Sequence, residues 1–181
     1  NWGQDMQKSA DRHQEMPVAF VYGWEPCLPF AASSPIPPDV SEYDIMGAIR
    51  GAPVELVDCE TVPLQVPASA EIVIEGWISA NPKTFEMEGP YGEYTGYYAG
   101  DQGPKHSIRV TAITHRNGAI LRGTIEGALP GSYSENATTS SIMRASTAWN
   151  VLDRSGVPGI TDVWCPPVQA GINLLIQMKQ S

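Results

Sequence analysis

The stretch Ser-Ile-Arg-Val-Thr-Ala-Ile-Thr-His at residues 107–115 largely alternates apolar and polar side chains. A period of two is typical of a strand that has one face on the core and the other in water. Asn117-Gly118 follows, a dipeptide that strongly favours a two-residue hairpin turn, and it predicts a second strand over 119–125. The stretch therefore indicates an antiparallel sheet.

Strand signals continue on both sides of this hairpin. Apolar segments are found at 16–22, 53–58, 62–66 and 70–79, and two more, near 160–165 and 172–179, close the sequence. Within 70–79, Gly76 predicts a bulge or a close backbone approach.

Three helices are predicted between these strands. The segments are 2–14, 42–50 and 134–154, and the third has Ser134 as its N-cap and Gly156 just past its end. Many strands and few helices favour an α+β domain with a mainly antiparallel sheet or barrel. The strand–helix alternation and glycine fingerprint of a dinucleotide fold are missing.

Composition excludes several classes of protein. The chain has 181 residues, which suits one domain, and a net charge of −9, which argues against nucleic acid and anionic membranes as partners. Its apolar runs are too short to span a bilayer. Three scattered cysteines (Cys27, Cys59 and Cys165) lack zinc-site spacing, so we expect reduced thiols and a cytoplasmic protein. The chain begins at Asn1 rather than Met, so we also expect a piece of something longer.

The stretch Glu-Gly-Pro-Tyr-Gly-Glu-Tyr-Thr-Gly-Tyr-Tyr at residues 88–98 places two carboxylates, Glu88 and Glu93, around a Gly-Pro turn. Local chemistry leaves two explanations open. A solvated acidic loop is the ordinary one, and a paired general acid and base is the other. Burial and a neighbouring carboxylate both raise the pKa of a glutamic acid, which suits it to deliver a proton.

Three regions together favour the second explanation. They are Met-Pro-Val-Ala-Phe-Val-Tyr-Gly-Trp-Glu-Pro at 16–26; Gly-Ala-Ile-Arg-Gly-Ala-Pro-Val-Glu-Leu-Val-Asp-Cys-Glu-Thr at 47–61 with Val-Pro-Ala-Ser-Ala-Glu-Ile-Val-Ile-Glu-Gly at 66–76; and 88–98 with Val-Thr-Ala-Ile-Thr-His-Arg at 110–116. In content, order and spacing they resemble the UbiD family of prenylated-flavin-dependent (de)carboxylases, over most of the chain.

The resemblance implies a fold, a cofactor and a reaction. Residues 1–181 are similar to the family's central flavin-binding domain, a split β-barrel of flavin-reductase type, without its N- and C-terminal regions. The implied cofactor is prenylated FMN, supplied by a flavin prenyltransferase and bound through its phosphate by Mn²⁺ (or Mg²⁺) and K⁺. The implied reaction is reversible decarboxylation of an aromatic, heteroaromatic or α,β-unsaturated acid, in a protein that forms homo-oligomers at full length.

The resemblance also assigns catalytic and metal-binding residues. Glu88 and Glu93 match the two active-site glutamates of the family's EGPxGE motif: the second donates the proton, and the first belongs to an ion-pair network with an arginine upstream of this chain. Glu42 matches the carboxylate ligand of the metal. Asp5 stands where the family has a metal-binding histidine, and Asp is also a suitable hard-oxygen ligand.

The remaining implied contacts are to the flavin. Ser33 and Ser34 match the segment that wraps the cofactor and supplies oxygens to the K⁺ site, and Gln4 matches a glutamine that faces the flavin. Two other functions stay open beside the catalytic one: a non-catalytic flavin-binding module and an assembly fragment.

Overall fold

A computed structural model describes residues 2–11, 15–33, 36, 40–93, 95–124, 133–167 and 173–180, with the side chains of 2–4 left out of the description. The chain divides into two compact units. Unit 1 comprises Asn1–Pro26, Tyr43–Pro90 and Gly100–Gly123, and unit 2 comprises Cys27–Glu42, Tyr91–Ala99 and Thr124–Ser181.

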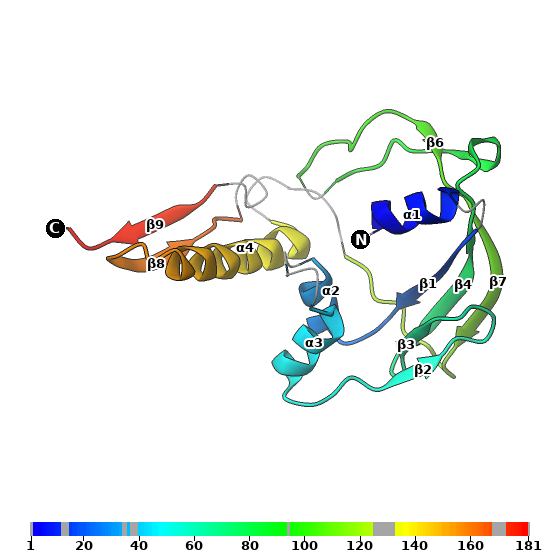
Figure 1. Cartoon of the computed structure of the whole chain (residues 1–181), viewed down its shortest axis with the longest axis horizontal. Coiled ribbons are helices and arrows are strands. Elements are labelled where there is room, and N and C mark those ends of the chain that lie inside the picture. The colour runs from blue at the N-terminus through cyan, green and yellow to red at the C-terminus, as the bar shows by residue number, and fades with distance from the viewer. Residues whose placement is uncertain are drawn as a thin grey trace. The chain divides into compact units, whose positions relative to one another are not determined.

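A three-stranded antiparallel sheet forms the centre of unit 1. Its strands are β1 (Met16–Tyr22), β4 (Ile72–Ile78) and β7 (Ile108–His115), and β4 lies between the other two (Figure 1). Phe20 pairs with Ile74, which pairs in turn with Ile113. All three strands were predicted from their apolar patterns, and the structure confirms them.

A β-bulge interrupts the pairing of β4 with β7. The register shifts between Glu75 and Gly76. A Cβ atom added to Gly76 would lie 2.6 Å from the carbonyl oxygen of Arg109, which is closer than a side chain can approach a backbone. Gly76 therefore marks both a bulge and a close backbone approach, as its place in the sequence predicted.

Short ribbons and helices make up the rest of unit 1. The ribbons pair β2 (Leu56–Asp58) with β3 (Gln65–Pro67) and β5 (Glu86–Glu88) with β6 (Gly103–Lys105). The helices are α1 (Trp2–Asp11), the single turn η1 (Pro82–Thr84) and α3 (Glu42–Arg50), whose first residue belongs to unit 2. Met6 of α1 packs on Val18 and Ile78 in a buried cluster, because the apolar side chains at one end of the sheet need cover from water.

The strand predicted over 119–125 is wrong for the residues that the structure describes, 119–124, which form no strand. The predicted turn is present, with Gly118 at φ +69°. Beyond it, the N–H of Ile120 donates to the Glu71 carboxylate at 3.1 Å, and Arg116 pairs with the same carboxylate at 3.1 Å. The N–H of Arg116, which would pair with Ala119 in a two-residue hairpin, donates instead to the carbonyl oxygen of Glu71 at 2.9 Å.

The described strands form four separate sheets rather than a closed barrel. The fold is therefore a mixture of helices and antiparallel sheet, as expected, and the split barrel stays a prediction. None of the helices in the described part of the chain combines the length and the apolar content that a membrane span requires.

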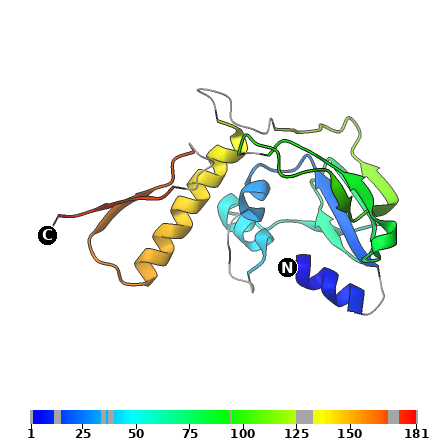
Figure 2. The same cartoon turned by 90° about the horizontal axis from the view of Figure 1, so that it is seen from above.

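Unit 2 contains α2 (Cys27–Ala32), α4 (Glu135–Arg154) and the ribbon of β8 (Ile160–Trp164) with β9 (Leu175–Met178). The Ser134 side chain caps α4 by accepting from the N–H of Ala137 at 3.1 Å, and Gly156 follows the helix at φ +68°. Both ends of α4 thus agree with the sequence prediction. Figure 2 shows α4 running beside the β8–β9 ribbon.

Candidate active site

Glu93 lies on a tight reverse turn in unit 2. Its N–H donates to the carbonyl oxygen of Tyr97 at 2.8 Å, its own carbonyl accepts from the N–H of Gly96 at 2.9 Å, and Gly92 bridges to Tyr98. Gly96 has φ +88°, a left-handed conformation that favours glycine. These bonds fix the backbone of Glu93, and the residue as a whole is half-buried.

Glu88 is the last residue of β5 in unit 1, where it pairs with Gly103 of β6. It is exposed, and the chain leaves the strand through Gly89 at φ +89°. A short ribbon therefore holds Glu88, and a hydrogen-bonded turn holds Glu93. Because Glu88 and Glu93 belong to different units, their meeting at one substrate stays a prediction.

The two carboxylates predicted to bind metal also belong to different units. Glu42 is the first residue of α3 and is exposed. Asp5 is exposed on α1, where its Oδ1 lies 3.3 Å from Nζ of Lys8. Among the described residues, no three His, Cys, Asp or Glu side chains lie close enough together to hold a metal ion. Both carboxylates are chemically suited to Mn²⁺ or Mg²⁺, and their role as ligands stays a prediction.

The residues predicted to contact the flavin are described only in part. Ser33 follows α2, and both its N–H, at 3.2 Å, and its hydroxyl donate to the carbonyl oxygen of Pro29. A hydroxyl that donates to a helix end still has oxygen lone pairs to offer a cation. Gln4 lies on α1 with its side chain outside the described atoms, and Ser34 lies outside the described residues altogether.

One buried carboxylate was not singled out as a candidate site residue from the sequence. Glu75, on the central strand β4, is only 1% exposed. Its Oε1 accepts from the N–H of Glu60 at 2.9 Å, and its Oε2 accepts from the N–H and the hydroxyl of Thr61 at 2.7 and 2.8 Å. Burial acts to raise the pKa of this carboxyl, but the hydrogen bonds from Glu60, Thr61 and Val62 outweigh it and hold the pKa below its ordinary value.

Glu75 therefore stays ionised and fastens the turn at 60–62 to the sheet. The signal that could have found it is a glutamate in an otherwise apolar strand directly before the glycine of the bulge. The charge also affects Cys59, since burial first, and then the charges of Glu75 and Asp58, raise the pKa of that thiol.

Comparison with known protein families shows to which family the chain belongs. Residues 1–129 match the 3-octaprenyl-4-hydroxybenzoate carboxy-lyase Rift-related domain. The chain belongs to the UbiD family. The EGPxGE motif, on β5 and the turn after it, lies within the matched residues.

Solved structures of UbiD-class enzymes share this fold. The chain is 32% identical to the UbiD-class enzyme HmfF from Pelotomaculum thermopropionicum in complex with prFMN, with a TM-score of 0.84 over 99% of this chain and 40% of that one. It is 27% identical to the vanillic acid decarboxylase of Sedimentibacter hydroxybenzoicus, with a TM-score of 0.85 over 98% of this chain and 37% of that one.

The relatives are much longer than this chain. An uncharacterised protein of Aquifex aeolicus is 44% identical over 118 residues, which are 65% of this chain and 24% of that protein. The chain thus spans well under half the length of the relatives and solved structures that it matches.

Proposed function

We propose that this chain is the flavin-binding part of a longer carboxy-lyase, which reversibly removes CO₂ from an aromatic, heteroaromatic or α,β-unsaturated carboxylic acid. The observation that carries the proposal is the family match over residues 1–129, which includes Glu88 and Glu93 in the EGPxGE motif. In the longer protein, further strands would complete the β1-β4-β7 sheet as a split barrel.

The proposed cofactor is prenylated FMN, which, when bound, supplies an electron sink for the carbon that loses CO₂. Hard oxygen donors suit the ions proposed to hold its phosphate. The carboxylates of Glu42 and Asp5 would bind Mn²⁺ or Mg²⁺, and Ser33 and Ser34 would offer oxygens to K⁺. Gln4 would face the flavin.

The chemistry proposed for the chain's own residues is proton transfer. Glu93 holds the proton that replaces CO₂ on the substrate carbon, and Glu88 tunes it as a neighbouring charge. The fixed backbone of the turn around Glu93 supports this role, because a general acid must be aimed to within hydrogen-bonding distance of its target.

The cellular setting forms part of the same proposal. A flavin prenyltransferase would deliver the cofactor, the complete protein would form a homo-oligomer, and the reaction would take place in the cytoplasm. Without the rest of the polypeptide, residues 1–181 alone would fold but would not turn over.

Replacement of Glu93 by Gln in the complete polypeptide tests the proposal. Gln keeps the size of the side chain and removes its acid, so turnover should fall by roughly 10² or more, the scale of a lost general acid, while bound flavin is retained. Exchange of solvent deuterium into the reacting carbon should fall equally. Glu86→Gln is the matched control, because Glu86 is an exposed glutamate on β5 outside the motif.

Near-normal turnover and exchange in the Glu93→Gln protein would remove the paired-acid assignment. Bound flavin without any decarboxylation in the unaltered, complete protein would instead support a non-catalytic flavin-binding module. This second function stays open because the chain covers only 40% of the HmfF chain.

A further inference from the structure

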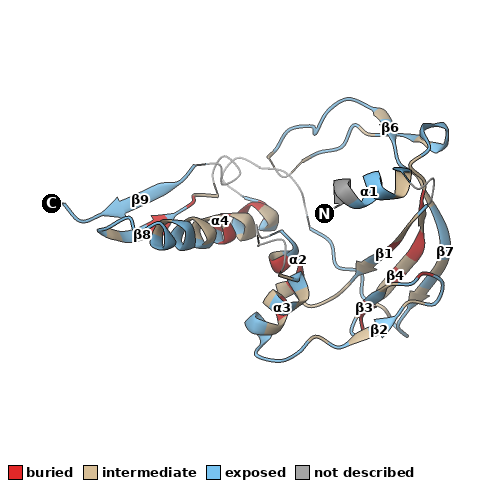
Figure 3. Ribbon diagram, viewed as in Figure 1, coloured by how far each residue is buried: buried red, intermediate tan, exposed pale blue. Residues whose placement is uncertain are grey.

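The β8–β9 ribbon carries apolar side chains on both of its faces. Val163 pairs with Ile176, and the next pair, Trp164 with Leu175, points to the opposite face because side chains alternate along a strand. All four residues of β9 are exposed, and the strand is pale blue along its length in Figure 3. An isolated two-stranded ribbon of this kind is marginally stable in water.

Helix α4 covers only half of one face of the ribbon. It packs against β8, where Val163 is 7% exposed, and the Ser141 hydroxyl donates to the carbonyl oxygen of Cys165. Within the described residues, α4 does not pack against β9, and Ile176, on the same face as Val163, is 41% exposed. The covered face of β8 thus continues into a bare face of β9.

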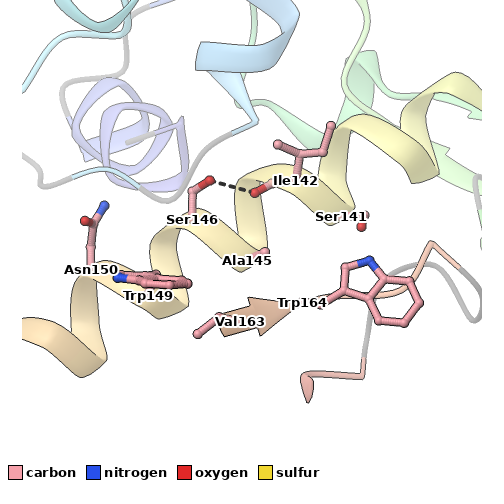
Figure 4. A pocket seen from close by; sticks show the side chains of 8 residues that line it. All are labelled: Ser141, Ile142, Ala145, Ser146, Trp149, Asn150, Val163 and Trp164. Carbon is pink, nitrogen blue, oxygen red and sulfur yellow. Dashed lines mark hydrogen bonds between the residues drawn. The ribbon is translucent and has the colours of Figure 1, made fainter. Parts of the chain in front are cut away.

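A hollow of about 420 Å³ lies at the junction of α4 and β8. Ile142, Ser146 and Trp149 line it from the helix, with Val163 from the covered face of β8 and Trp164 from the end of that strand (Figure 4). Ser141, Ser146 and Asn150 are the polar residues of the lining; the Ser146 hydroxyl donates to the carbonyl oxygen of Ile142 at 2.9 Å and the Ser141 hydroxyl to that of Cys165, so both hydroxyls have partners. The other five lining residues, Ile142, Ala145, Trp149, Val163 and Trp164, are apolar, so the hollow suits mainly apolar side chains.

We propose that a second helix of the same polypeptide packs beside α4, lies over β9 and inserts apolar side chains into this hollow. The inference rests on the proposed function, in which the chain is part of a longer enzyme. A helix fits because packed domains cover one face of a sheet with neighbouring helices, each about 10 Å across.

Two observations favour the same polypeptide over a second copy of this chain. The matched HmfF chain contains far more residues than this chain covers, since the coverage is 40%. Two copies of this chain, each with a net charge of −9 over its whole length, repel one another at long range.

Two glutamate substitutions on α4 test the proposal. Ile142 and Val151 are similarly exposed, at 53% and 57%, but only Ile142 lines the hollow. The full-length protein is purified from its source organism, and its intact mass gives its length. Hydrogen exchange of the β9 amides then compares it with residues 1–181. In the longer protein these amides should exchange about 10-fold more slowly or better, the effect of burying one large apolar side chain. Ile142→Glu should remove that protection, and Val151→Glu should keep it.

Several results would overturn the proposal. These are an intact mass equal to that of residues 1–181, equal exchange of β9 in both proteins, or equal effects of the two substitutions. A concentration-dependent dimer of the longer protein that Ile142→Glu dissociates would assign the face to a second copy. The exchange experiment needs no turnover, so an inactive protein with a protected β9 would refute the proposed function and leave this inference standing.

Discussion

The buried carboxylate of Glu75 supports a quantitative prediction about stability. Glu75→Gln keeps the length and shape of the side chain but replaces one acceptor oxygen by an NH₂ donor. The carboxylate faces only donors, the N–H of Glu60 and the N–H and hydroxyl of Thr61. In either orientation of the Gln amide, at least one backbone N–H therefore loses its acceptor and faces another donor.

The magnitude follows from these bonds. A buried N–H without an acceptor costs about 1–3 kcal/mol, and each remaining bond falls from the charged to the neutral range, a loss of about 1 kcal/mol. Removal of a buried charge returns part of the desolvation cost. We expect the free energy of unfolding to fall by about 2–4 kcal/mol in net terms, a large share of the stability of an ordinary domain.

Urea unfolding followed by circular dichroism measures this loss, and hydrogen exchange at the Glu60 and Thr61 amides localises it. The pH dependence has a definite sign. Because the folded-state pKa of Glu75 is depressed, its stabilisation is present above the ordinary pKa of 4.5 and is lost as the pH falls through the folded value. The gap between the wild-type protein and Glu75→Gln should therefore shrink with acidification.

Glu60→Gln is the matched control, because it removes one exposed charge from the same turn. It should change the free energy of unfolding by no more than about 0.5 kcal/mol. The reasoning is refuted if Glu75→Gln is as stable as this control, or if the gap to the wild-type protein widens at low pH.

Two further predictions concern the same region. Gly76→Ala should destabilise the protein by about 2 kcal/mol or more, because its Cβ would meet the Arg109 carbonyl. Gly92→Ala, with open space around its Cβ, should cost far less. Thermal melts compare the two variants, and equal melting temperatures would contradict the close approach at Gly76. Cys59 should react slowly with iodoacetamide at pH 8, since burial first and then nearby carboxylates raise the pKa of its thiol. Glu75→Gln should speed the reaction, which mass spectrometry follows. An unchanged rate would show that Glu75 does not contribute to the raised pKa of Cys59.

Sequence patterns predicted the regular elements better than the chain's irregular paths. The strands at 16–22 and 70–79 and the helix at 134–154 follow from local signals, namely apolar runs, a capping serine and a glycine just past the helix end. The wrong strand after Asn117-Gly118 failed for a non-local reason. The N–H of Arg116 donates to Glu71, far away in the sequence, instead of pairing with Ala119, and no local pattern reports that bond.

The candidate site shows the same division. The EGPxGE motif was visible as a resemblance, because both glutamates lie in one short stretch. The role of Glu75 was not visible, because its partners at 60–62 are remote in sequence and only the folded β2–β3 region brings them over β4. A glutamate in a strand predicts equally well an exposed face or a fully bonded interior.

The strand order β1-β4-β7 has a consequence for biosynthesis. Met16 pairs with Ile78, and Ile78 pairs with Ile108, so no strand of the central sheet finds its partner nearby in the chain. Such non-local pairings are slow to form because a long loop must close before any contact compensates its entropy. At about 5–20 residues per second of translation, β1 leaves the ribosome seconds before β4 follows. During that interval its apolar Val18 and Phe20 would be the nascent chain's natural target for a chaperone.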